Sequence, residues 1–318
     1  MSIGYVYGYT WDAEIIRKCK NEKKLLRASI AIPGGKEGSE CNMKCIFCFT
    51  ENGKRHRNQK RVTDEIAIKF AYEASEFAYD RQLMNYFFVS EGEPTLNPNL
   101  EYILDEVGKL GGTMTIFSNL YKLTEKQINA FTKHKNLFVC GKMYGVSAKV
   151  NDELTALPGS LNQMRKNIET LMKNGLADER RLGVQCVVTS KNYNEVFDLF
   201  LWARKNNIVP HLMMYREQGL GSSYPELSIS KKSLLKLWKK CSEYDRIHNH
   251  HFWTPRLPLL GIGECRIPGV NLYLVDNGDV HVCAGDTRTY GNYFEQSVKE
   301  LMNSNLYDNV LHTFKSCP

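Results

Sequence analysis

The chain has 318 residues, of which 42% are hydrophobic and 24% charged, as in an ordinary globular protein. Its net charge of +7, from 42 basic and 35 acidic residues, permits an acidic partner without requiring one. The sequence contains no run of about eighteen apolar residues and no signal peptide at its start, which argues against a membrane protein and favours the cytoplasm. No nucleic-acid-binding motif accompanies the positive charge, so a nucleic-acid partner is not expected.

Short apolar runs alternate with amphipathic segments along the first two thirds of the chain. After a helical stretch at 11–20, we expect strands at 28–32, 86–89, 113–117, 137–147, 184–188 and 208–215. The expected helices lie at 63–79, 100–110, 124–134, 161–174 and 194–205. This alternation predicts an α/β fold with parallel strands joined by helical crossovers. The pattern alone allows either a barrel-like or a doubly wound open sheet.

Three cysteines lie between the first strand and the helix at 63–79. Cys41, Cys45 and Cys48 are separated by three and two residues, and the chain has no second Cys-x-x-Cys pair. Cysteine thiolates hold iron–sulfur clusters, normally four to a cluster. A structural zinc site, the main alternative, also needs four ligands and usually takes them from two pairs. We therefore interpret the run as three ligands of a 4Fe–4S cluster with one iron left open.

This run resembles the Cys-x3-Cys-x-aromatic-Cys signature of the radical S-adenosylmethionine (SAM) enzymes, with Phe47 at the aromatic position. The resemblance implies a partial (β/α)6 barrel in which the open iron chelates SAM and Phe47 lies near the adenine. It also implies that one electron from the cluster cleaves SAM into methionine and a 5′-deoxyadenosyl radical, which removes hydrogen from an unactivated carbon.

Residues after later strands resemble the SAM-binding positions of the same family. Residues 90–94, Ser-Glu-Gly-Glu-Pro, are similar to its Gly-Gly-Glu-Pro motif, with Glu91 in place of the first glycine. The resemblance implies that Glu93 binds the SAM amino group. It further implies that Ser118 and Asn119 bind the ribose hydroxyls and that Ser147 and Lys149 bind the SAM carboxylate. Val187 is implied to contact the adenine. The alternatives are turn-forming roles and, for Val187, a place in the core.

The last third of the chain contains charged residues, a linker and a second group of cysteines. Arg216 and Glu217 close the sixth predicted strand, and we expect both to face the substrate as catalytic residues. A glycine- and serine-rich linker and a cationic helix at 230–244 follow.

Cys265 and Cys283 flank a predicted hairpin whose turn contains Gly278, so they can meet. The arrangement resembles the SPASM and twitch domains of radical SAM enzymes, which implies an auxiliary 4Fe–4S cluster. Cys317 is a further candidate ligand, and Arg256, His251 or the substrate could be the fourth. Two separate core cysteines are the alternative.

The predicted organisation is an N-terminal extension at 1–25, a radical SAM partial barrel at 26–217, a linker with a helix at 218–264 and a small hairpin-plus-helix auxiliary-cluster domain at 265–318. Because an auxiliary cluster can accept an electron, we expect oxidation of a small hydroxylated metabolite such as an aminocyclitol, sugar or nucleoside. The alternative is a peptide maturase that forms thioether or carbon–carbon cross-links. A non-enzymatic zinc or redox module is the third interpretation. The basic run at 54–61 is either a solvated loop or a docking patch for a flavodoxin- or ferredoxin-type electron donor.

Overall fold

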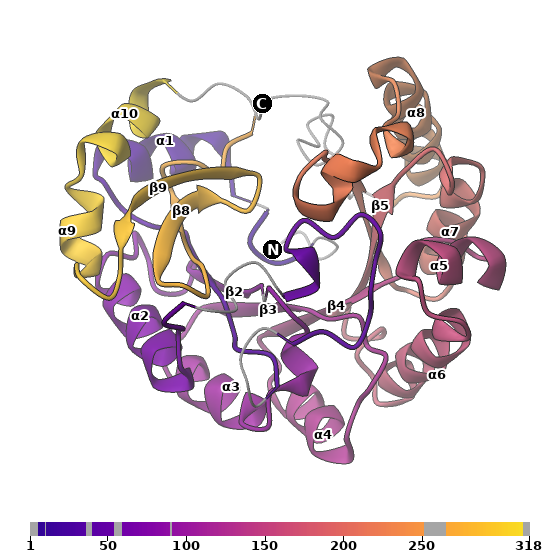
Figure 1. Cartoon of the computed structure of the whole chain (residues 1–318), viewed down its shortest axis with the longest axis horizontal. Coiled ribbons are helices and arrows are strands. Elements are labelled where there is room, and N and C mark those ends of the chain that lie inside the picture. Colours follow the sequence, from indigo (N-terminus) through magenta and orange to yellow (C-terminus); the bar gives the residue numbers. More distant parts are fainter. Residues whose placement is uncertain are drawn as a thin grey trace.

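A computed structural model of the chain describes residues 6–9, 11–35, 40–53, 59–89, 91–250 and 265–313. In this part of the chain the central sheet has nine strands in the order β6-β5-β4-β3-β2-β1-β7-β8-β9 (Figure 1). The first six are parallel and follow one another in space: β1 Arg27–Ile30, β2 Asn85–Phe88, β3 Thr113–Phe117, β4 Leu137–Lys142, β5 Leu182–Val188 and β6 Val209–Met214. β7 (Asn271–Leu274) is parallel to β1, whereas β8 (Asp279–Cys283) and β9 (Asp286–Asn292) continue the sheet antiparallel.

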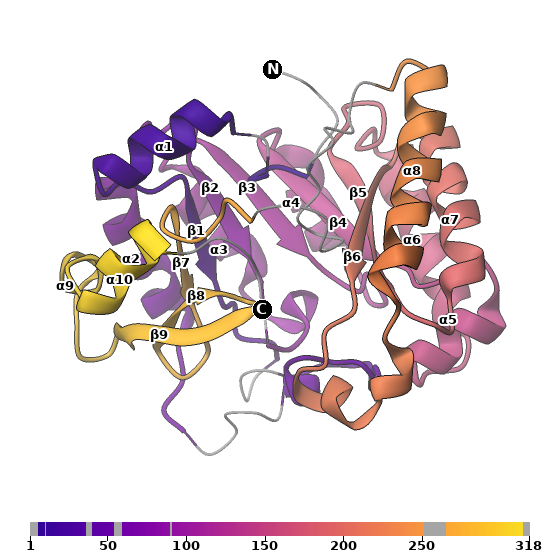
Figure 2. The same ribbon diagram turned by 90° about the horizontal axis from the view of Figure 1, so that it is seen from above.

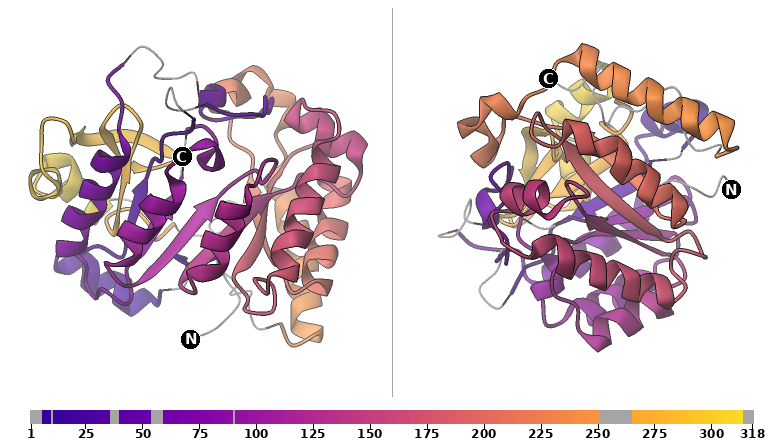
Figure 3. Two further views of the ribbon diagram at one scale, coloured as in Figure 1. Left: turned by 90° about the horizontal axis from the view of Figure 1, so that it is seen from below. Right: turned by 90° about the vertical axis from the view of Figure 1, so that its right-hand side faces the viewer.

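Helices cover the outer side of the curved sheet (Figures 1 and 3). The helices between the parallel strands are α2 Asp64–Glu76, α3 Leu100–Gly108, α4 Glu125–Lys133, α6 Ser160–Lys173 and α7 Tyr193–Lys205, with a short additional helix, α5 Ala148–Thr155, before α6. α8 (Lys231–Ile247) packs beside α7, and α1 (Ala13–Asn21), α9 (Val298–Met302) and α10 (Asn305–Thr313) lie near the C-terminal strands (Figure 2). Thr63 caps α2, because its hydroxyl accepts a bond from the Ile66 N–H at 3.3 Å.

Alternating residues of each parallel strand face opposite sides of the sheet. Ala28, Phe88 and Ile116 belong to the main hydrophobic core, which packs against the helices. Their neighbours Ser29 and Phe87 line a cavity on the inner side. The inner face therefore carries the residues that are available for chemistry.

The observed sheet confirms the predicted α/β fold, a partial barrel followed by a C-terminal hairpin. The barrel is open, because β6 and β9 form the two edges of the sheet. One predicted boundary is wrong: the strand expected at 137–147 ends at Lys142, and Ser147 instead caps α5. β9 and α5 were not predicted.

The segments outside the six-stranded unit also pack onto it. The Thr115 hydroxyl donates to the Tyr7 carbonyl at 3.0 Å, and the Tyr9 and Phe87 rings are 5.7 Å apart, so residues 6–9 lie across the inner face of the sheet. The C-terminal hairpin shares the same sheet through β7 and β1. The division into four segments therefore stays a prediction. Among the described helices, none has the length and hydropathy needed to cross a membrane.

Candidate active site

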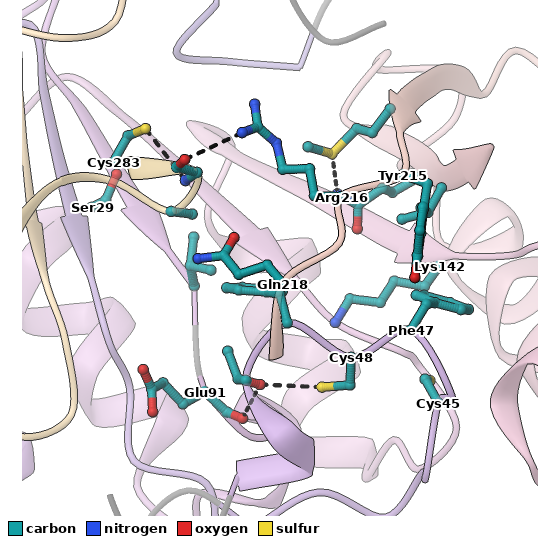
Figure 4. Close-up of a pocket in the computed structure, with 18 of the residues that line it drawn as sticks. Ser29, Cys45, Phe47, Cys48, Glu91, Lys142, Tyr215, Arg216, Gln218 and Cys283 are labelled. Atoms are coloured by element: carbon teal, nitrogen blue, oxygen red, sulfur yellow. Dashed lines mark hydrogen bonds between the residues drawn. The ribbon is translucent and has the colours of Figure 1, made fainter. Parts of the chain in front are cut away.

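The inner face of the sheet surrounds a cavity of about 240 Å³ that both groups of cysteines line. Cys41, Cys45 and Cys48 lie on one side of it and Cys265 and Cys283 also contribute to its wall. In Figure 4, Cys283 and Ser29 lie on the opposite side of the cavity from Cys45 and Cys48. The fold therefore brings two groups of thiols that are more than 200 residues apart in sequence to one enclosed space.

The loop that carries the first three cysteines is fixed at both ends by the loop after β2. At one end the Glu93 N–H donates to the Glu40 carbonyl at 2.7 Å, and at the other the Thr50 hydroxyl donates to the Glu91 carbonyl at 2.7 Å. Between them, the Ile46 N–H donates to the Leu154 carbonyl at the end of α5 at 3.1 Å. These hydrogen bonds hold the cysteine loop against the β2 loop and α5.

The loop offers three thiols, the ligand type that an iron–sulfur cluster needs. Burial, reinforced by the Glu93 carboxylate, raises the pKa of Cys41 to about 11, and burial also raises the pKa of Cys45 far above its ordinary value. A cluster must therefore displace the protons of these thiols when it binds. Burial opposes the charge of Lys142, but the Glu93 carboxylate and the nearby thiolates outweigh this effect and raise the Lys142 pKa. A cation beside the thiols offsets the negative charge that ligation creates.

The first cysteine loop supplies three thiols, one fewer than a structural zinc site takes. In the described residues, no three His, Cys, Asp or Glu side chains converge on a point where they could hold one metal ion. Structural zinc needs four such ligands around one atom.

Phe47 and Val187 both line the cavity, as the resemblance implies for residues near the adenine. The Phe47 ring packs edge-on against Tyr144, with ring centroids 4.7 Å apart. Together with Cys45 and Tyr215 these residues form a small apolar cluster next to the cysteine loop. They provide the flat apolar surface that a purine ring requires.

Glu93 is fully buried and does not line the cavity. Its carboxylate accepts four hydrogen bonds: from the Thr95 N–H and hydroxyl at 3.1 and 2.8 Å, the Ser118 hydroxyl at 2.5 Å and the Asn119 N–H at 2.7 Å. In this structure the polar groups of Glu93 and Ser118 therefore bind each other, and their expected contacts with SAM stay a prediction. Glu91 and Gly92 line the cavity in place of Glu93, although Figure 4 shows the Glu91 side chain directed away from Cys48.

Asn119 does reach the cavity, beside the cysteines. Its side-chain amide donates to the Asn42 side chain at 2.7 Å, and its carbonyl oxygen accepts the Tyr121 N–H at 2.8 Å. Of the pair expected to meet the ribose, Asn119 lines the cavity and Ser118 does not.

Ser147 and Lys149 lie away from the cavity. The Ser147 hydroxyl donates to Glu195 at 2.5 Å and caps α5, while Lys149 is exposed and lines a separate shallow depression on the surface. The cause is the early end of β4, which places Lys142, rather than residues 147–149, at the carboxyl end of the strand. Lys142 lines the cavity, and it is the cation that the sequence analysis missed.

Arg216 and Glu217 diverge after β6. Arg216 lines the cavity and its Nη1 donates to the Gly285 carbonyl at 3.2 Å, in the turn after Cys283. Glu217 is exposed, accepts a bond from the Ser228 hydroxyl at 2.5 Å and does not line the cavity, so its expected role toward the substrate stays a prediction. Gln218 lines the cavity instead and lies with Arg216 between the two groups of cysteines (Figure 4).

The predicted hairpin around Gly278 is present, with Tyr273 paired to His281 and Gly278 at φ +86°. Cys283 ends β8 and its sulfur accepts the Gly285 N–H at 3.3 Å. Such N–H···S contacts are typical around cluster ligands. Cys317, His251, Arg256 and the run at 54–58 lie outside the described residues.

Arg27 and Ser29 were also missed, although both line the cavity from β1. The signal was available in the sequence: polar residues at alternate positions of an apolar run mark the inner face of a strand.

Comparison with solved structures agrees with this architecture. Streptococcus suis SuiB bound to S-adenosylmethionine superposes with a TM-score of 0.70 and 19% identity, covering 94% of this chain and 71% of SuiB. Native anSMEcpe with bound AdoMet gives a TM-score of 0.64 and 19% identity, covering 89% and 83% of the two chains.

Among curated proteins, the mycofactocin maturase MftC of Mycobacterium tuberculosis is 20% identical over 257 residues, which cover 76% of this chain and 61% of MftC. The probable GTP 3′,8-cyclase of Sulfolobus acidocaldarius is 27% identical over 186 residues, or 57% of this chain and 55% of that protein. The chain thus spans about three fifths of the length of the first of these relatives and about half of the second.

These comparisons contradict one prediction. MftC is a maturase, and solved structures of similar fold hold peptides, the precursor SuiA in SuiB and Cp18Cys in anSMEcpe. The expected small hydroxylated metabolite as substrate, and its oxidation as the main function, are therefore wrong, and the peptide alternative is the better supported one.

The model of the Radical SAM superfamily matches residues 38–208, more than half of the chain and the part that carries the three-cysteine loop. The chain therefore belongs to the radical SAM superfamily, whose enzymes use a 4Fe–4S cluster and SAM.

Proposed function

We propose that this protein is a radical SAM maturase that oxidatively modifies a peptide. The observation that carries the proposal is that the likeness to SuiB covers 94–95% of this chain, including a form of SuiB bound to its precursor peptide. The cavity that joins the two groups of cysteines supports it, because peptide oxidation needs both a site of hydrogen removal and an acceptor for the remaining electron.

In this proposal Cys41, Cys45 and Cys48 hold the cluster that supplies the electron for SAM cleavage. Lys142 binds the SAM carboxylate, because it is a cation on the wall next to these cysteines. Asn119 meets the ribose, and the backbone at 91–92 is available to the amino group.

Glu93 acts as a positioning residue. It joins the β2 loop, which fixes the cysteine loop, to Asn119, which lines the cavity. Holding SAM in one orientation is the main contribution that the protein can make to the hydrogen transfer.

Cys265 and Cys283 are proposed to hold the auxiliary cluster. Removing a hydrogen atom from the peptide leaves a carbon radical, and loss of a further electron and a proton completes a two-electron oxidation. An acceptor within the same cavity fits this requirement, and the reaction class is then that of an oxidoreductase. A cross-link between peptide side chains would have the same balance, a loss of two hydrogen atoms.

The substrate side chain is proposed to lie beside Arg216 and Gln218. Both occupy the middle of the cavity, and the wall around them includes Met213, Met214 and Tyr273. Arg216 already donates one N–H to Gly285, which orients its guanidinium toward the cavity. A polar group of the peptide can accept its remaining N–H donors.

The test uses anaerobically reconstituted protein with SAM, dithionite and, one at a time, the peptides encoded by short reading frames beside its gene. We expect one peptide to lose about two daltons and to increase 5′-deoxyadenosine formation. A Cys41→Ala/Cys45→Ala/Cys48→Ala variant should form no 5′-deoxyadenosine.

A Cys265→Ala/Cys283→Ala variant serves as the matched control. It should still cleave SAM but yield little modified peptide, since only the electron acceptor is removed. Full SAM cleavage by the triple variant would contradict the site assignment. If no peptide changes mass or stimulates cleavage, the peptide proposal fails.

A further inference from the structure

Arg27 is a buried cation at the cavity wall that has no ion-pair partner within the described part of the chain. Arg27 is only 5% exposed, and its Nε donates to the Asn271 side-chain oxygen at 3.0 Å. The guanidinium lies between the Tyr9 and Phe87 rings, 5.1 and 4.7 Å from their centroids. Its Nη1 is buried and has no acceptor, and no described carboxylate lies within salt-bridge distance. A buried charge in this state is costly unless a counter-charge is supplied.

Two other buried arginines show what Arg27 lacks. Arg204 makes two bonds to the Asp245 carboxylate, at 2.9 and 2.6 Å. Arg181 bonds to the Glu179 carboxylate and to three backbone carbonyls. Arg27 differs from both in facing a cavity, which is where its missing partner must bind.

Asn271, which accepts the hydrogen bond from Arg27, also bonds to β8, the strand that carries Cys283. Asn271 accepts from Arg27 and from the Ser29 hydroxyl, and its own amide donates to the Val282 carbonyl at 3.1 Å, next to Cys283. These bonds tie β1, β7 and β8 together at the place where Arg27 enters the cavity. Tyr9, which packs against Arg27, is also within electrostatic range of Cys265.

We infer that Arg27 is the positioning residue that sets the redox potential of the cluster held by Cys265 and Cys283. This inference rests on the auxiliary cluster of the proposed function. A fixed positive charge stabilises the reduced, more negative form of a cluster, and N–H donors to its sulfurs act in the same direction. Arg27 thereby makes the cluster a better acceptor for the electron that leaves the substrate.

The experiment is an anaerobic potentiometric titration of the reconstituted protein, followed by electron paramagnetic resonance. The auxiliary signal is identified as the one missing from the Cys265→Ala/Cys283→Ala variant. In Arg27→Gln, the reduced-to-oxidised ratio of this cluster at a fixed potential should fall about tenfold. For a one-electron couple this is a shift of about 59 mV to lower potential. Arg27→Lys keeps the charge but not the planar donors, so its potential should lie between the two.

A second variant distinguishes an effect on the potential from a failure of Arg27→Gln to fold. Asn271→Asp keeps Arg27 but gives it a carboxylate partner, so it should also lower the potential. Lys142→Gln removes a different cavity cation and should leave the auxiliary potential unchanged.

If Arg27→Gln and Asn271→Asp both hold two clusters at the wild-type auxiliary potential, the inference is overturned and the counter-charge of Arg27 belongs to the substrate. If the wild-type protein holds iron and sulfide for one cluster only, it is the proposed auxiliary site that fails.

Discussion

Replacing Glu93 by glutamine distinguishes a residue that organises the SAM site from one that binds SAM directly. In the structure one carboxylate oxygen accepts three donors, from Thr95 and Ser118, and the other accepts the Asn119 N–H at 2.7 Å. A glutamine side chain keeps one acceptor oxygen and turns the other into a donor. In the better of its two orientations the glutamine oxygen keeps the three donors from Thr95 and Ser118. The NH2 group then points at the Asn119 N–H, which loses its acceptor.

The energetic cost follows from the burial of this site. Glu93 has no exposed surface, so water cannot replace the lost acceptor. Losing one hydrogen bond to a charged group costs about 1.5–3 kcal/mol, and leaving a buried N–H without a partner costs about 1–3 kcal/mol more. We therefore expect Glu93→Gln to lower the free energy of unfolding by about 3–5 kcal/mol. SAM affinity should fall as well, because Asn119 and the cysteine loop lose their support.

The assay is urea unfolding of wild type and variant at equal iron content, with SAM binding measured in parallel by calorimetry. Glu195→Gln is a matched control, since Glu195 also accepts several bonds, from the Val146 N–H and from the Ser147 N–H and hydroxyl, but lies outside the cavity. It should reduce stability and leave SAM affinity unchanged. A Glu93→Gln variant with wild-type stability and a ten- to hundred-fold loss of SAM affinity would refute the reasoning and make Glu93 a direct ligand.

Three further outcomes are expected. Lys142→Gln should weaken SAM binding about ten- to hundred-fold, the value of a charge-assisted bond, whereas Lys149→Gln should not change it; equal effects in calorimetry would contradict the assignment. Gly219 has φ +59°, and an added Cβ would lie 2.7 Å from the Cys48 carbonyl oxygen, so Gly219→Ala should cost about 2–4 kcal/mol in unfolding and reduce the iron content. Gly159→Ala, at φ +78° with open space, should cost only about 1 kcal/mol, and similar losses in both would argue against the close approach. Asp276 is 3% exposed and burial raises its pKa to about 7, although Arg61 opposes the shift. The folded state therefore prefers the protonated acid, and stability is lost as pH rises from about 4 to 7. Asp276→Asn should gain about 2–3 kcal/mol relative to wild type between pH 5 and pH 8, and a pH-independent difference in urea unfolding would count against this.

Local patterns were sufficient where spacing along the chain determines the chemistry. The Cys41–Cys48 run predicts a cluster-binding loop because three thiols within eight residues can ligate one small inorganic cluster. The alternation of apolar runs depends on neighbouring residues only, and the six parallel strands that it predicts are present in the structure. Gly278 predicts its hairpin for the same reason.

Local patterns failed where the end of an element determines which residue enters the site. The run at 137–147 has β-forming residues on both sides of Lys142, and its two glycines, Gly141 and Gly145, do not by themselves show where the strand ends. The strand stops there because its pairing with β5 ends at Lys142 and Gln185, and Ser147 begins a helix held by Glu195. The strand was predicted to end five residues too late, at 147 instead of 142. The sequence analysis therefore chose Lys149 as the cation near the strand end, whereas Lys142 occupies that place in the structure.

The sequence by itself determined the family, the cluster-binding loop and the six parallel strands, because these depend on residue types at short spacing. Only the tertiary structure decided which side chains share the cavity. Arg27 and Asn271 are 244 residues apart and meet because β1 pairs with β7. Glu93 lies behind the cavity wall because its carboxylate bonds to Ser118 and Asn119, which directly follow β3. The face that a side chain occupies and the partner opposite it are set by strand pairing between distant segments, which short-range sequence patterns do not encode.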